Sequence, residues 1–155
     1  MDTPTIEKSY KQLQTKYNLP AFEDLNEEFE LSAIEESEFL LSEVRKRIAD
    51  KINNILAVLD EILFPEATPS SMHECNAFSE EEKKQIMILF RRIMALSRES
   101  SLAYLKADEA SQAEFIGNFV SEWIEIKKDL NTIFEKLRDA WIHELEKQDD
   151  AGYFG

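Results

Sequence analysis

Two pairs of glutamates are spaced so that each pair could contribute to a divalent metal site. Glu35 and Glu38 stand three residues apart near the start of one predicted helix, and Glu122 and Glu125 have the same spacing on another. Residues three apart share one face of a helix, so each pair would present two carboxylates together. Mg²⁺ prefers such oxygen ligands and leaves its other positions to water and phosphate groups. These four glutamates are the candidate metal ligands.

This spacing is similar to that of the all-α nucleotide pyrophosphohydrolases, which hold Mg²⁺ between two neighbouring helices. Those enzymes usually carry Glu-x-x-Glu on one helix and Glu-x-x-Asp on the next. No Glu-x-x-Asp follows either pair at the spacing of those enzymes, and a chain with 32 acidic residues contains such pairs by chance. A Mg²⁺-dependent nucleotide hydrolase is therefore the alternative hypothesis.

Other catalytic and metal-binding patterns are incomplete. Di-iron bundles need Glu-x-x-His twice, but Ser70 and Ala140 occupy the positions three residues before the two histidines. The segment 65–78 contains His73 and Cys75, which are two metal ligands where a zinc site needs three or four. No glycine-rich phosphate loop or nucleophile motif occurs. We therefore predict no cofactor and no catalytic residue. We expect the segment 65–78 to be a loop and leave its role open.

Composition limits the partners that the protein can bind. The chain has 155 residues and a net charge of −14. Nucleic acids and anionic membranes both attract basic surfaces, so we expect neither as a partner. The single cysteine cannot form an internal disulfide, the N-terminus lacks the features of a signal peptide, and no apolar run is long enough to span a membrane. We therefore expect a cytoplasmic protein.

Hydrophobic periodicity predicts an all-α fold. The expected architecture is an antiparallel bundle of three long helices, about 33–64, 80–106 and 109–147, with a short two-helix N-terminal arm over 4–30. We expect one domain over 1–148 and a disordered tail over 149–155, whose role stays open.

Local signals set the ends of the predicted helices. Thr3-Pro4 starts the arm, because threonine caps a helix and proline fits its first turn. Ser32 with Glu35, and Ser79 with Glu82, have the spacing of a capping box. A very short connection around Asp108 makes the second and third long helices antiparallel neighbours.

The last long helix is the element on which the bundle is expected to be built. About forty residues would reach roughly 60 Å at 1.5 Å per residue, which is longer than either partner helix. The part that overhangs them carries the apolar residues Phe134, Leu137, Trp141 and Leu145. We expect the N-terminal arm or a second copy of the chain to cover this apolar surface.

Four basic residues lie close together in the first long helix: Arg45, Lys46, Arg47 and Lys51. The favoured interpretation is a solvated helix face on which they pair with Glu43 and Asp50. An anion-binding site is the alternative.

The leading hypothesis for function is a non-enzymatic helical interaction or adaptor protein. The chain lacks a catalytic set, and the second long helix is apolar over more than one face. We therefore expect a protein partner or a homodimer. The residues expected to make the contact are Ile86, Leu89, Phe90, Ile93 and Trp141.

Overall fold

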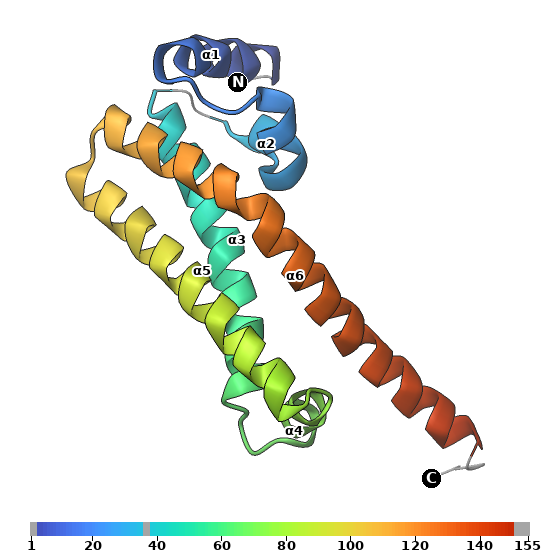
Figure 1. Ribbon diagram of the computed structural model, residues 1–155. Coiled ribbons are helices and arrows are strands. Elements are labelled where there is room, and N and C mark those ends of the chain that lie inside the picture. Colours follow the sequence, from blue (N-terminus) through green and yellow to red (C-terminus); the bar gives the residue numbers. More distant parts are fainter. Residues whose placement is uncertain (1–2, 36–37, 151–155) are drawn as a thin grey trace. The chain divides into compact units, whose positions relative to one another are not determined.

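The computed structural model describes residues 3–35 and 38–150, and within these ranges the chain is all-α. The helices are α1 (Thr3–Tyr17), α2 (Phe22–Phe29), α3 (Leu40–Leu63), α4 (Pro69–Asn76), α5 (Glu80–Lys106) and α6 (Glu109–Asp150), with a 3₁₀ turn η1 at Leu31–Ala33 (Figure 1). Helices α3, α5 and α6 pack as an antiparallel bundle and α1 and α2 form the arm, which confirms the predicted fold class. Every helix in the described ranges is too short or too polar to cross a bilayer.

The helices contribute to two compact units, which we describe separately. The first unit comprises Met1–Leu56 and Arg92–Trp123, and the second comprises Ala57–Arg91 and Ile124–Gly155. The first unit thus contains α1, α2, η1, α3 as far as Leu56, and the parts of α5 and α6 next to their connection. That the chain is a single domain over 1–148 stays a prediction.

The arm packs within the first unit through aromatic contacts. In α1, the fully buried Tyr10 ring lies 5.7 Å from the Phe22 ring of α2, measured between ring centroids. The Phe29 ring of α2 lies 5.7 Å from Phe119 and 6.0 Å from Trp123 of α6. These contacts bury the apolar faces of both short helices, which neither could do alone.

The helix predicted from about residue 33 begins instead at Leu40, so the prediction is wrong at this end. Before it, the chain is extended at Ile34, whose side chain is 3% exposed. The expected capping box of Ser32 and Glu35 does not form, because the backbone N–H of Ser32 donates to Asn26 Oδ1 at 2.7 Å. Burial of Ile34 and the bond to Asn26 hold this segment outside a helix.

The segment 65–78, predicted as a loop, contains helix α4. Thr68 is its N-cap, and the Thr68 hydroxyl accepts a hydrogen bond from the backbone N–H of Ser71 at 3.2 Å. Pro69 takes the first helical position, where its missing N–H costs nothing. Thr68-Pro69 therefore marks the start of α4 with the same signal that was predicted to start the arm at Thr3-Pro4.

Helix α4 covers part of the apolar surface that the arm was predicted to cover. The His73 ring lies 4.5 Å from the Trp141 ring, and Trp141 Nε1 donates to Glu74 Oε2 at 3.0 Å. Farther along α6, Leu145 is 64% exposed. Helix α6 runs to Asp150, two residues into the segment predicted to be disordered. Residues 151–155 of that segment lie outside the described residues.

The capping box at the start of α5 is confirmed. The backbone N–H of Glu82 donates to Ser79 Oγ at 3.1 Å, and the backbone N–H of Ser79 donates to Glu82 Oε1 at 2.9 Å. The second carboxylate oxygen of Glu82 accepts a hydrogen bond from Lys136 of α6. Glu82 therefore caps α5 and also ties it to α6 in the second unit.

We predict that this contact makes stability depend on pH. The hydrogen bond from Lys136, followed by those from Ser79, lowers the pKa of Glu82 from 4.5 to about 2. A lowered folded-state pKa stabilises the fold above the unfolded-state value, and this contribution is lost as the pH falls from about 4.5 toward 2. Urea unfolding from pH 7 to pH 2 should therefore show the advantage of wild type over Glu82→Gln disappearing in this window. The exposed Glu61→Gln serves as control, and parallel curves for wild type and Glu82→Gln would contradict the prediction.

Only Ala107 and Asp108 separate α5 from α6. Ala107 has a φ of 59°, and its backbone N–H donates to the Ala103 carbonyl at 3.0 Å. This left-handed residue ends α5, a position that glycine usually occupies. Asp108 then caps α6, because its Oδ1 accepts from the Ser111 backbone N–H at 2.6 Å. The tight reversal holds the two helices side by side in the first unit (Figure 1).

Replacing Ala107 with glycine should stabilise the protein. The left-handed conformation costs a non-glycine residue about 1 kcal/mol, and Ala107→Gly removes that cost. The same substitution at the exposed Ala57, inside α3, should destabilise by about 1 kcal/mol. Urea denaturation of both variants measures the two effects. Destabilisation by both would contradict the role of Ala107.

Candidate functional site

The predicted metal ligands form no metal-binding group within the described residues. Glu35 precedes α3 and Glu38 lies in a turn before it, so they do not share a helical face. Glu122 accepts a hydrogen bond from Arg92 Nε at 3.2 Å, and Glu125 lies 3.8 Å from a lysine Nζ on its own helix. In residues 3–35 and 38–150, no three His, Cys, Asp or Glu residues are placed to hold a metal ion. The Mg²⁺-dependent hydrolase stays a prediction.

His73 and Cys75 lie on α4 in the second unit. His73 Nε2 is 3.1 Å from the Ala140 carbonyl oxygen, and its ring packs against Trp141. Cys75 is buried, with 7% of its surface exposed. In the described structure both side chains take part in packing.

Three of the five residues predicted to contact a partner are buried within the chain. Ile86, Leu89 and Ile93 are 3%, 5% and 2% exposed, and Phe90 is half-buried. Only Trp141, at 39% exposure, retains a large accessible surface. An exposed apolar surface that could bind a partner must therefore be sought elsewhere on the chain.

The exposed apolar side chains of the first unit gather near the end of α5. Among the described residues of this unit, four large apolar side chains are more than half exposed, and we call them the α5-end surface: Phe39 (68%), Leu102 (56%), Tyr104 (65%) and Leu105 (75%). Three of them stand on the last turns of α5, and Phe39 immediately precedes α3. Two cavities open beside this surface.

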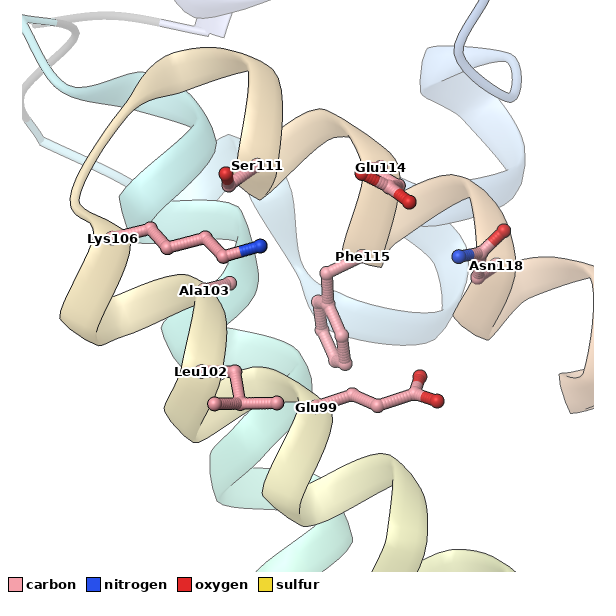
Figure 2. Close-up of a pocket in the computed structure, with 8 residues that line it drawn as sticks. All are labelled: Glu99, Leu102, Ala103, Lys106, Ser111, Glu114, Phe115 and Asn118. Carbon is pink, nitrogen blue, oxygen red and sulfur yellow. The ribbon is translucent and has the colours of Figure 1, made fainter.

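The first cavity lies between the last turns of α5 and the first turns of α6 and has a volume of about 220 Å³ (Figure 2). Its apolar wall consists of Leu102 and the buried Ala103 and Phe115. Figure 2 shows that charged and polar groups from both helices surround this wall: Glu99, Lys106, Ser111, Glu114 and Asn118. The cavity thus combines a small apolar wall with a rim that carries both positive and negative charges.

The second cavity lies beside the same turn and has a volume of about 290 Å³. Phe39 and Tyr104 supply aromatic walls, and Ala107 contributes the left-handed residue of the turn. The polar lining comes mainly from the first turns of α3: Ser42, Glu43, Arg45 and Lys46, with Gln112 from α6. This cavity therefore contains two cationic side chains beside exposed aromatic rings.

Arg45 joins all three long helices of the first unit. Its side chain is 6% exposed, and Nε donates to Gln112 Oε1 at 2.7 Å. Nη1 donates to Ser100 Oγ at 3.1 Å, while Gln112 Nε2 donates to the Ala103 carbonyl at 2.7 Å. Gln112 and Ser100 are themselves 1% and 3% exposed. The result is a buried network that links α3, α5 and α6.

The Arg45 network contains no carboxylate. Burial lowers the pKa of the Arg45 guanidinium, and Tyr104 and Glu43 partly offset this effect. The Tyr104 ring centroid lies 5.5 Å from Arg45 Cζ, a distance at which the ring face attracts a cation. Glu43 forms its ion pair with Lys46 at 3.0 Å. Arg45 is thus a buried cation that hydrogen bonds only to neutral groups of the described chain.

The burial of Arg45 corrects the favoured interpretation of the basic residues in α3. Lys46 pairs with Glu43 as expected, but Arg45 does not lie on a solvated face. The sequence contains a signal for this burial, because Arg45 stands four residues after Leu41 and three before Ile48, both buried. This spacing places Arg45 along the apolar stripe.

Comparisons of the chain with protein-family models, with curated proteins and with solved structures found no match. We therefore infer function from the contacts, exposure and charge described above.

Proposed function

We propose that the protein is a non-enzymatic interaction protein that binds a partner protein through the α5-end surface. The observation that carries this proposal is the grouping of Phe39, Leu102, Tyr104 and Leu105 beside two cavities. A single exposed apolar residue is common on any protein, whereas several such residues on neighbouring turns beside hollows are typical of binding sites. Trp141 of the predicted set would make a separate contact in the second unit.

The surroundings of these residues favour a protein partner. Protein interfaces combine apolar anchors with a polar, solvent-accessible rim. Here Leu102 stands beside Glu99 and Lys106 in the first cavity, and Tyr104 stands beside Lys46 in the second. The exposed aromatic and leucine side chains are suited to act as anchors because they can enter pockets on a partner.

The expected occupant is a segment of a different protein that carries apolar residues and an acidic group. Arg45 and Lys46 give the second cavity a positive charge, which an acidic group would complement. A second copy of the chain would approach with the same net charge of −14, and the two copies would repel each other at long range. The same charge disfavours nucleic acid, and the cytoplasmic location inferred from the single cysteine remains part of the proposal.

We predict that Leu105→Asp abolishes partner binding without unfolding the protein. Leu105 is 75% exposed, so a charge at this position disrupts an interface more than it disturbs the chain. The control is Ile88→Asp, on the same helix but in the second unit, where Ile88 is 60% exposed. Affinity capture with mass spectrometry should recover a defined protein with wild type and Ile88→Asp, and at least about tenfold less with Leu105→Asp.

Light scattering supplies the second part of this test, and circular dichroism checks that both variants remain folded. The proposal expects a monomer. A dimer that Leu105→Asp dissociates would show that a second copy occupies the surface, and would contradict a distinct partner. Equal recovery of the captured protein with both variants would also contradict it.

A further inference from the structure

The guanidinium of Arg45 has hydrogen-bonding capacity that the chain does not use. Arginine carries five N–H donors. One from Nε and one from Nη1 bind Gln112 and Ser100, and Nη2 has no partner within the described residues. No buried side-chain nitrogen or oxygen in the described ranges lacks a hydrogen bond, so Nη2 is not sealed inside the protein. Arg45 lines the 290 Å³ cavity, so this cavity can give Nη2 access to solvent.

The charge of the same cavity is also incompletely balanced. Arginine is almost never fully buried unless it is paired, because a buried cation loses its hydration. Both observed partners of Arg45 are neutral, and the only acidic side chain lining the cavity, Glu43, is bound to Lys46. Two cations therefore face one carboxylate in this cavity, although the chain as a whole carries a net charge of −14.

The walls of the cavity determine what kind of anion would fit. Its volume of about 290 Å³ is close to the lower end of ligand pockets, roughly 300 Å³. Phe39 and Tyr104 line it, and both side chains are largely exposed. The planar fork of a guanidinium matches the oxygens of a carboxylate or a phosphate. The arrangement suits a small anionic head attached to an apolar or aromatic body.

We propose that this cavity is an oxyanion-binding site, in which Arg45 donates to a carboxylate or phosphate group while the apolar part of the ligand lies against Phe39 and Tyr104. Lys46 at the rim adds a second positive charge. The inference rests on the proposed function, which already expects an acidic group in this cavity, and deepens it by naming the residues that bind that group; it is tested at Arg45 and Tyr104, whereas the protein-binding surface is tested at Leu105. A free small molecule or an acidic group on a partner would satisfy the same chemistry.

The test uses two probes that separate the two head groups. Sodium benzoate offers a carboxylate on an aromatic ring, and inorganic phosphate offers the phosphate group alone. Each is titrated into the full chain while the Arg45 Nε–H and Gln112 side-chain amide signals are followed by NMR, with sodium chloride at equal ionic strength as control. We expect saturable shifts of these signals with at least one probe and no comparable shift with chloride. The probe that binds more tightly identifies the preferred head group.

Variants assign the binding to the cavity. Arg45→Met should weaken binding at least about tenfold, because it removes a charge-assisted hydrogen bond. The matched control is Arg98→Met, which removes the same charge from an exposed position on α5. Arg45→Met also removes the hydrogen bonds to Gln112 and Ser100, so Tyr104→Ala provides a second test on an exposed side chain. It should weaken benzoate binding several-fold, while Ile88→Ala, at an exposed apolar residue outside the α5-end surface, should not.

Shifts that follow ionic strength alone would overturn the proposal, as would equal benzoate affinity in wild type and Tyr104→Ala. Such a result would leave Arg45 with a purely structural role. It would remove the acidic group from the expected occupant but leave the protein-binding surface itself, which is tested at Leu105. Conversely, oxyanion binding in the cavity together with undiminished partner capture by Leu105→Asp would support the oxyanion site and contradict the protein-binding proposal.

Discussion

The first unit depends on a cation that is buried without a carboxylate partner. Taking an arginine out of water costs several kcal/mol, and neutral hydrogen bonds recover only part of this free energy. Arg45 is nevertheless buried, with only 6% of its surface exposed. It is held by Gln112, Ser100 and the face of the Tyr104 ring. Its three partners come from α5 and α6, so both helices must present those residues to α3. The network therefore fixes the register of three helices.

The turn between α5 and α6 completes this arrangement. Gln112 can reach both Arg45 and the Ala103 carbonyl only because no more than two residues separate α5 from α6. The tightness of the turn places Ala107 in a left-handed conformation, which the surrounding contacts maintain. A longer connection between the two helices would allow Ala107 to leave the left-handed conformation.

An incompletely neutralised cation also explains the cavity that Arg45 lines at this end of the unit. Closing apolar side chains over Arg45 would remove the remaining solvation of Nη2, which no other group of the described chain replaces. Phe39 and Tyr104 instead line the cavity and remain exposed. The exposure of Phe39 and Tyr104 and the proposed oxyanion site therefore have a common physical origin, because both depend on the cavity beside Arg45.

Local signals in the sequence predicted those elements whose ends are set by side-chain caps. Ser79 and Glu82 fixed the start of α5 because both hydrogen bonds of the capping box form. The start of α3 could not be predicted in this way, because the cap expected at Ser32 competes with a bond to Asn26. Helix α4 was predictable from Thr68-Pro69, although it is short and weakly amphipathic.

The candidate site was less accessible to sequence reasoning. Periodicity places Ile86, Leu89 and Ile93 on apolar faces but does not show how many neighbours cover them, and in the structure they are buried. Arg45 has the spacing of a core position, but only the tertiary structure supplies Gln112, 67 residues away, as its partner. Long-range pairing of this kind depends on how the helices pack.

The most direct test of this account is a double-mutant cycle between Arg45→Met and Gln112→Leu, measured by urea denaturation. Each single variant leaves a buried polar partner unpaired and should destabilise the protein by about 2–4 kcal/mol. The double variant removes both members, so its loss should be at least about 1 kcal/mol smaller than the sum of the single losses. Losses that add to within about 0.5 kcal/mol would contradict the network as the interaction that holds the three helices together.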